Sequence, residues 1–125
     1  MARQNFGSGY PFEETYGYSR AVRVGGHVYV SGTTARGEAL AGDAYVQACA
    51  ILGLIEAALA QADAQLRHVV RTVVYVTDLA FQDAITRAHG EVFGSIRPAS
   101  TLVQVVALTP NTARVEIEAT AVIAN

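Results

Sequence analysis

Residues 114–123 read RVEIEATAVI, and their side chains alternate between apolar and polar along almost the whole stretch. Alternation with a period of two is typical of a β-strand that buries one face and exposes the other. The polar set contains Glu116, Glu118 and Thr120. We therefore predict a strand here, with the two glutamates on one face and roughly 7 Å apart.

Two further stretches predict neighbouring strands. Residues 70–77, VRTVVYVT, are rich in β-branched side chains, which favour the pleated conformation of a strand. Residues 100–108, STLVQVVAL, follow a break at Pro98 and are apolar on both faces. Upstream, the short runs 21–24 and 27–31 flank Gly25-Gly26, a pair that suits a tight hairpin turn. Residues 33–42 are small and polar, which predicts a loop or an irregular edge strand.

Two segments carry the spacing of amphipathic helices. Over residues 44–62 the apolar side chains recur at helical intervals behind Asp43, which can cap the first turn, while Gln47 falls off the apolar stripe. A second helix is predicted from Phe81 to about Phe93. The order of elements is β-β-(β)-α-β-α-β-β, which predicts an α+β fold with a single mixed sheet and two helices on one face.

Two helices cover only one face of such a sheet, so the other face needs a partner. The apolar side chains that we expect on this uncovered face are Leu102, Val106, Leu108, Val73 and Tyr75. A patch of that size exceeds the few hundred Å² that a monomer usually exposes. The pattern therefore predicts a closed homo-oligomer.

Composition narrows the class of protein. The chain has 125 residues, of which 51% are apolar and only 16% charged, so a single folded domain spanning residues 1–125 is expected. A net charge of −2 and the lack of a run of basic residues disfavour nucleic acid as a partner. The sequence contains no signal peptide and no run of about 18 consecutive apolar residues, so we expect no membrane partner and a cytoplasmic location. Cys49 stands alone among alanines and leucines, which predicts a small core residue.

The first seventeen residues form a segment of distinct composition. Five of the ten aromatic residues lie within positions 1–18, separated by glycines and a proline. This composition predicts an extended arm over residues 1–17 that packs through its rings.

Few side chains have the spacing that catalysis or metal binding requires. Glu116 and Glu118 fit a solvated strand face, but beside apolar neighbours a carboxylate would be desolvated and could act as a base near neutral pH. His89 and Glu91 are two residues apart on a helix and so point in different directions, and the paired cysteines of a zinc deaminase are missing. We therefore expect no metal and no other cofactor.

Four stretches together resemble one family. They are GYSRAV at 17–22, VSGT at 30–33, VYVTDL at 74–79 and VEIEA at 115–119. Their order and spacing are similar to those of the Rid/YjgF/UK114 family of reactive-intermediate deaminases. The resemblance implies a chorismate-mutase-like fold, a homotrimer, and a ligand cleft at each subunit interface. It also implies hydrolysis of the enamines and imines that pyridoxal-phosphate enzymes release.

The resemblance assigns roles to individual positions. It makes Glu116 the catalytic, water-activating residue and Tyr18 the cleft tyrosine, with Ser31, Gly32 and Thr33 binding substrate. In the family's enzymes an arginine after Pro-Ala clamps the substrate carboxylate, but here RPAST at 97–101 puts Ser100 in that place. The remaining substrate-binding candidates are Thr86, which replaces a cleft asparagine, Thr101, and Arg97, which could swing in as a substitute cation.

Three functions follow as hypotheses. The first is an imine or enamine hydrolase, acting on C=N bonds, whose substrate is less anionic than a 2-imino acid because Ser100 carries no charge. The second is a non-catalytic module of the same fold that binds a small metabolite or another protein. The third, endoribonuclease activity, is disfavoured by the net negative charge.

Overall fold

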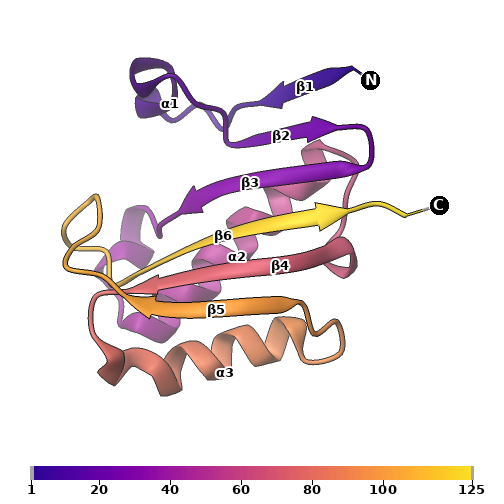
Figure 1. Cartoon of the computed structure of the whole chain (residues 1–125). Helices are drawn as coiled ribbons and strands as arrows, with labels where there is room; N and C mark the ends of the chain where they lie inside the picture. The colour runs from indigo at the N-terminus through magenta and orange to yellow at the C-terminus, as the bar shows by residue number, and fades with distance from the viewer. Residues whose placement is uncertain (1, 125) are drawn as a thin grey trace.

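The computed structural model describes residues 2–124, which form one six-stranded sheet and two long helices, one of them behind the sheet and the other beside its edge (Figure 1). The strands are β1 Arg3–Phe6, β2 Ala21–Val24, β3 His27–Thr33, β4 Val69–Val76, β5 Ala99–Gln104 and β6 Val115–Val122. The helices are α1 Pro11–Tyr16, α2 Ala44–Gln61 and α3 Gln82–Phe93, and short 3-10 helices lie at η1 Gly37–Ala41, η2 Leu66–His68 and η3 Leu79–Phe81.

The strands lie in the order β1-β2-β3-β6-β4-β5. All neighbouring pairs are antiparallel except β4 and β5, which are parallel and joined through α3. The predicted α+β class and single mixed sheet are confirmed. The last strand of the chain, β6, lies in the middle of the sheet, so its two glutamates are held between β3 and β4.

The core lies between the sheet and the helices α2 and α3. Asp43 caps α2 as predicted, since its carboxylate accepts a hydrogen bond of 2.9 Å from the backbone N–H of Val46. By length and composition alone, α2 is also the one helix within residues 2–124 that could cross a membrane. Here its apolar residues, among them Ile51, Ile55 and Leu59, are buried in the core.

Two residues of α2 differ from the prediction. Gln47 is fully buried rather than on the polar side, because its amide donates to Leu40 O at 2.8 Å and accepts from Arg114 N–H at 2.8 Å. These bonds satisfy backbone groups that would otherwise lack a partner. Cys49, predicted as a core residue, is exposed, since it falls on the solvent side of the helix.

The N-terminal arm is only partly extended, which corrects the prediction for residues 1–17. Residues 3–6 form β1 and pair with β2, while Pro11–Tyr16 form the short helix α1. Pro11 stands at the first turn of the helix, and Gly17 ends it with φ of 89°. We call residues 8–18, with α1 at their centre, the N-terminal lobe.

The strand predicted over residues 100–108 is shorter, because β5 ends at Gln104. Its only neighbour, β4, ends at Val76, and after one further hydrogen bond from Val105 N–H to Val76 O the chain leaves the sheet. Val106 is therefore 103% exposed in a loop instead of lying on the sheet. Leu102 also differs from the prediction, since it packs against the core on the helix side.

The sheet face opposite the helices is open. The strand register places Val73 and Tyr75 there, as predicted, in rows with Glu118 and Glu116 of β6. Val103 of β5 extends the second row. This open face thus carries apolar side chains beside the two carboxylates, and the N-terminal lobe stands at one end of it (Figure 1).

Candidate functional site

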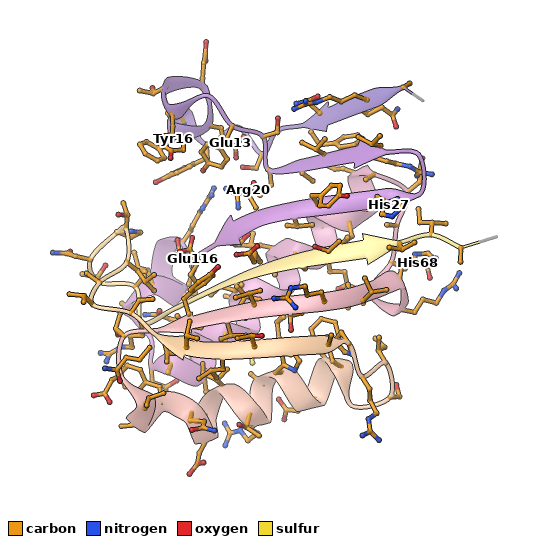
Figure 2. All side chains as sticks on the ribbon, viewed as in Figure 1. Glu13, Tyr16, Arg20, His27, His68 and Glu116 are labelled. Atoms are coloured by element: carbon orange, nitrogen blue, oxygen red, sulfur yellow. The ribbon has the colours of Figure 1, made fainter. Side chains whose placement is uncertain are left out.

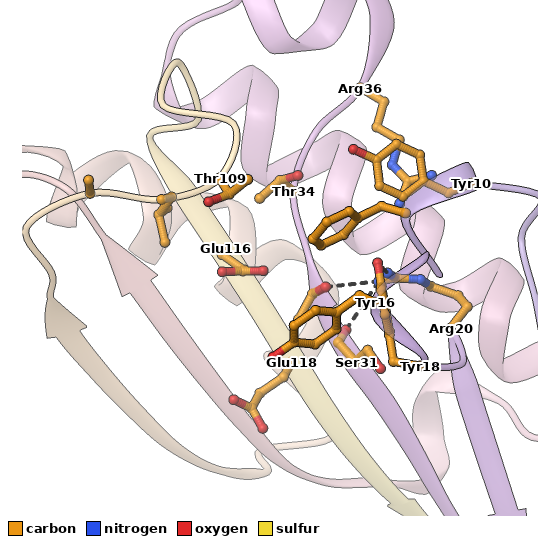
Figure 3. A pocket seen from close by; sticks show the side chains of 14 residues that line it. Tyr10, Tyr16, Tyr18, Arg20, Ser31, Thr34, Arg36, Thr109, Glu116 and Glu118 are labelled. Atoms are coloured by element: carbon orange, nitrogen blue, oxygen red, sulfur yellow. Dashed lines mark hydrogen bonds between the residues drawn. The ribbon is translucent and has the colours of Figure 1, made fainter. Parts of the chain in front are cut away.

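A cavity lies on the open face of the sheet, between the N-terminal lobe and the loop that follows β5 (Figure 3). Its volume is about 570 Å³, which is within the usual range for small-molecule sites. Aromatic rings of the lobe form one wall, from Tyr10, Phe12, Tyr16 and Tyr18. Charged side chains also line it, from Arg20, Arg36, Glu116 and Glu118.

Glu116 is the half-buried carboxylate of this cavity. It lies on β6 opposite Tyr75 of β4, and burial raises the pKa of its carboxyl above the ordinary value. The positive charge of Arg20 lowers this pKa, and the negative charge of Glu118 raises it further, so the net shift is upward. A carboxylate with a raised pKa can take and return a proton closer to neutral pH than an exposed one.

Gly32 makes room for this carboxylate. The pairing of β3 with β6 shifts register between Val30 and Thr33, so Ser31 and Gly32 bulge out of the ladder. A Cβ atom at Gly32 would lie only 2.6 Å from Glu116 Oε2. The absence of a side chain at position 32 is therefore what allows Glu116 to reach its place.

Arg20 holds the bulge and the lobe together. Only 5% of this residue is exposed, and its guanidinium donates to Gly32 O at 2.8 Å and to Thr33 Oγ1 at 2.8 Å. It also donates to the hydroxyl of Tyr18 at 2.9 Å (Figure 3). Thr33, predicted to bind substrate, is buried and uses its hydroxyl in this network.

Glu13 connects the lobe to Arg20 (Figure 2). Its carboxylate lies 3.5 Å from Arg20 Nε and accepts hydrogen bonds from the N–H of Ser8 at 3.0 Å and the hydroxyl of Ser8 at 2.5 Å. Burial acts to raise the pKa of Glu13, but the bonds from Ser8 and the charge of Arg20 outweigh burial and lower it. Glu13 is therefore a buried, ionised anchor for the lobe.

The second glutamate of β6 has a different partner. The Tyr75 hydroxyl donates a hydrogen bond to the Glu118 carboxylate, and this bond raises the pKa of Tyr75. Glu118 is thus engaged within the sheet. Glu116 is the carboxylate of the pair that is available to a bound molecule.

The structure brings together four of the predicted site residues and leaves five outside the cavity. Glu116, Tyr18, Ser31 and Gly32 line it. The five that do not are Thr33, Thr86, Arg97, Ser100 and Thr101. The last four of these are exposed on or near α3 and β5, at the opposite edge of the sheet from the lobe.

Ser100 belongs to a separate hydrogen-bonded group. Its hydroxyl accepts from Thr72 at 2.8 Å, and the same Thr72 oxygen lies 2.9 Å from His89 Nε2. Burial lowers the pKa of His89, which favours the neutral ring. Arg97 lies in a different groove beside His89, Phe93 and Pro98, and its side chain is not directed at Glu116's cavity.

Sequence reasoning missed Arg20, Glu13 and Arg36. Arg20 lies two residues after the motif residue Tyr18, but its partners in β3 are eleven or more residues away, so spacing alone could not reveal them. Within residues 2–124 no group of three metal-ligating side chains is close enough to hold an ion. His27 and His68 lie at the other end of the strands from Glu116 (Figure 2).

Comparison with known proteins identifies the family. The family model described as Endoribonuclease L-PSP matches residues 11–123. The crystal structure of Rv2704 from Mycobacterium tuberculosis, a member of the YjgF/YER057c/UK114 family, is 44% identical and superposes with a TM-score of 0.92. That match covers 98% of this chain and 100% of Rv2704. The chain belongs to the Rid/YjgF/UK114 family.

Two further proteins are similar to this chain over most of their length. The uncharacterised protein SCO2049 of Streptomyces coelicolor is 39% identical over 114 residues, which cover 89% of this chain and 85% of SCO2049. The RutC family protein PYRAB12510 of Pyrococcus abyssi is 34% identical over 108 residues, which cover 83% of this chain and 84% of that protein.

Proposed function

We propose that this protein is a homotrimeric hydrolase of enamines or imines, with one cleft at each subunit interface and a substrate other than the common small 2-imino acids. The observation that carries the proposal is Glu116, a half-buried carboxylate with a raised pKa at the floor of a 570 Å³ cavity. Family membership supports the reaction class, because the chain retains the glutamate and the tyrosine that the family resemblance assigns to the cleft.

The reaction needs one group that moves a proton to and from water. Glu116 takes a proton from water as the oxygen attacks the imine carbon, which forms a C–O bond and moves the C=N electron pair to nitrogen. Glu116 then returns that proton to nitrogen, which gives a carbinolamine. It next takes the proton of the new hydroxyl group and passes it to nitrogen, so that the C=O bond forms as the C–N bond breaks and ammonia leaves. An enamine enters the same sequence through its imine tautomer.

A trimer would complete the cleft. Within one subunit, Ser100, Thr101 and Thr86 lie at the far edge of the sheet from Glu116, so they can meet that cavity only from another copy. The open face offers Val73, Tyr75 and Val103 for such a contact. Apolar burial at about 25 cal/mol per Å² is the expected driving force for this association.

Ser100 determines which substrates fit. A neutral hydroxyl cannot form the paired, charge-assisted hydrogen bonds that an arginine forms with a carboxylate. The binding free energy that a substrate carboxylate loses at this position is about 1.5–3 kcal/mol, which corresponds to roughly 10- to 150-fold weaker binding. We infer that the substrate's acidic group, if it has one, does not bind beside Ser100.

The test is ammonia release from freshly generated 2-iminobutyrate by the wild type and by Ser100→Arg. We expect slow release by the wild type and a gain of roughly 100-fold in kcat/KM for the arginine variant. Rapid turnover by the wild type would contradict the role given to Ser100. Failure of both proteins would contradict hydrolysis of such imines and favour the binding module.

The non-catalytic module is the second candidate, and one observation favours it. The Ser100 hydroxyl is engaged by Thr72, so this edge of the cleft has hydrogen-bonding groups but no charge directed at a substrate. In that case the cavity would hold a metabolite without turning it over. Saturable binding of a keto acid together with no ammonia release from the matching imine would support this candidate.

A further inference from the structure

The chemistry of the cavity wall points to a class of ligand. We propose that the cavity takes a planar aromatic compound with a carbonyl or imine at one end and a carboxylate at the other, the ring lying against Phe12 and Tyr16 and the carboxylate on Arg36. The inference deepens the proposed function and rests on it for the reacting group only. Ring and carboxylate recognition follow from the wall itself.

The wall is a continuous set of rings on the N-terminal lobe (Figure 3). Phe12 and Tyr16 are stacked with ring centroids 5.4 Å apart, and Tyr10 and Tyr18 contact Phe12 edge to face at 6.4 and 6.2 Å. Aromatic pairs in these arrangements are favourable beyond the area that they bury. A planar ligand can extend the stack by one more ring.

These rings are not used by the hydrophobic core. Tyr16 is 73% exposed, Phe12 45% and Tyr10 38%, and none of the three belongs to the cluster between the sheet and the helices. The lobe that carries them is nevertheless held in place, because Glu13 is bound by Ser8 and Arg20. An apolar surface that is exposed yet fixed in position is suited to binding a ligand with little loss of conformational entropy.

Arg36 supplies a cation at the same wall. Its guanidinium carbon lies 3.9 Å from the centroid of the Tyr10 ring, so the guanidinium is stacked and its N–H edge remains free to donate. Among residues 2–124 the recorded ion pair joins Arg20 to Glu13, and no carboxylate pairs with Arg36. Arg36 can therefore take up the carboxylate of a ligand.

The size and the polarity of the cavity agree with such a ligand. At about 570 Å³ the cavity is larger than a three- or four-carbon imino acid needs. Glu116 and Arg36 line the same cavity, so a molecule that spans it can present its reacting carbon to one and its carboxylate to the other. This arrangement also explains how the chain can lack a cation at Ser100 and still bind an acid.

Calorimetric titration with stable carbonyl compounds tests the inference without any turnover. The probes are 4-acetylbenzoate, which has the ring, the carbonyl and the carboxylate, acetophenone, which lacks the carboxylate, and pyruvate, which lacks the ring. We expect 4-acetylbenzoate to bind most tightly. Arg36→Gln should weaken the binding of 4-acetylbenzoate by about 10- to 100-fold and leave the affinity for acetophenone unchanged.

Variants of the ring wall test the second contact. Phe12→Ala should weaken 4-acetylbenzoate by about 3- to 10-fold, while Phe12→Tyr keeps the ring and should keep the affinity. Arg67→Gln, at an exposed arginine far from the cavity, is the matched control and should bind like the wild type. Circular dichroism of each variant checks the fold, and these side chains lie outside the core.

Three results would overturn the inference. The first is that pyruvate and 4-acetylbenzoate bind equally well. The second is that neither Arg36→Gln nor Phe12→Ala changes the binding of 4-acetylbenzoate. The third is that Phe12→Ala loses oligomeric mass, which would make the rings a subunit contact. The reaction is judged separately. Tight binding of 4-acetylbenzoate without ammonia release from the matching imine would refute the hydrolase but support the proposed class of ligand. Ammonia release without binding of 4-acetylbenzoate would support the hydrolase but refute that class of ligand.

Discussion

At the scale of single residues, the site depends on what surrounds one carboxylate. Glu116 is half-buried, faces Gly32 across the bulge of β3, and has its pKa raised by burial. Arg20 binds the carbonyl of the same Gly32 and partly offsets that rise. A change at Gly32 should therefore alter Glu116 without altering the fold.

Gly32→Ala tests the room that Glu116 needs. The added Cβ would lie 2.6 Å from Glu116 Oε2, so the carboxylate must move, while the backbone conformation at position 32 is not one that favours glycine. We expect kcat/KM to fall by about 100-fold and the free energy of unfolding to change by less than about 1 kcal/mol. Gly53→Ala, at an open position of α2, is the control and should keep full activity. Equal activity of the two variants would contradict this account of Gly32.

Glu116→Gln tests the raised pKa through stability. Because the folded state holds this proton more tightly than the unfolded chain, the contribution of Glu116 to stability is full below the ordinary pKa of 4.5 and is lost as pH rises through the raised value. The glutamine variant should therefore melt at a higher temperature than the wild type at pH 7, and the difference should shrink toward pH 4. Thermal melts of Glu56→Gln, at an exposed residue, give the baseline. A wild type that melts at a higher temperature than Glu116→Gln at pH 7 would refute the raised pKa of Glu116.

At the scale of elements, the long regular segments were predictable and the short ones were not. The helix predicted over 44–62 is α2 at Ala44–Gln61, and the alternating stretch 114–123 is β6 at Val115–Val122. The apolar side chains of α2 recur at helical intervals over several turns, and those of β6 alternate with polar ones along most of its eight residues. In contrast, α1 has only six residues and no such pattern, and β5 ends where its neighbour β4 ends, which is a property of the sheet and not of the sequence of β5.

The candidate site shows the same division. Tyr18, Ser31, Gly32 and Glu116 lie in motifs that can be recognised along the chain, and they do meet in one cavity. Arg20 and Glu13 escaped prediction because their contact depends on how the lobe folds back over β3. Local spacing carries no information on such a contact.

Glu13→Gln tests whether this contact holds the lobe. The lowered pKa of Glu13 means that its contribution to stability is present above the ordinary value of 4.5 and is lost as pH falls through the lowered one. Removing the charge should increase amide exchange over residues 11–18 at neutral pH by about tenfold or more, because hydrogen bonds to a charged group contribute about 1.5–3 kcal/mol. Glu14→Gln, on the exposed side of the same helix, should exchange like the wild type. Equal protection in both variants would show that the lobe is held by other contacts.

At the scale of the whole molecule, some of the apolar side chains lie outside the core. Val73, Tyr75 and Val103 lie on the open sheet face, with the cavity of Glu116 at one end of it. The other predicted ligand contacts, Ser100 and Thr101, lie at the opposite edge. A closed ring of subunits would join the two edges and bury the open face.

Light scattering in dilute buffer measures this association. Three copies of the 13.2 kDa chain should give a mass of roughly 40 kDa. Replacing Val103, on the open face, with Lys should lower the mass, because a charge would be buried at the contact. A wild-type mass near 13 kDa would rule out a shared cleft.

In the proposed hydrolase, Glu116 moves the proton in the cleft. The most direct test of this role is the rate of ammonia release from 2-iminobutyrate by Ser100→Arg and by the double variant Ser100→Arg/Glu116→Gln. We expect Ser100→Arg to release ammonia faster than the wild type, and the double variant to be about 10²- to 10⁴-fold slower than Ser100→Arg. A double variant as active as Ser100→Arg would show that Glu116 does not move the proton.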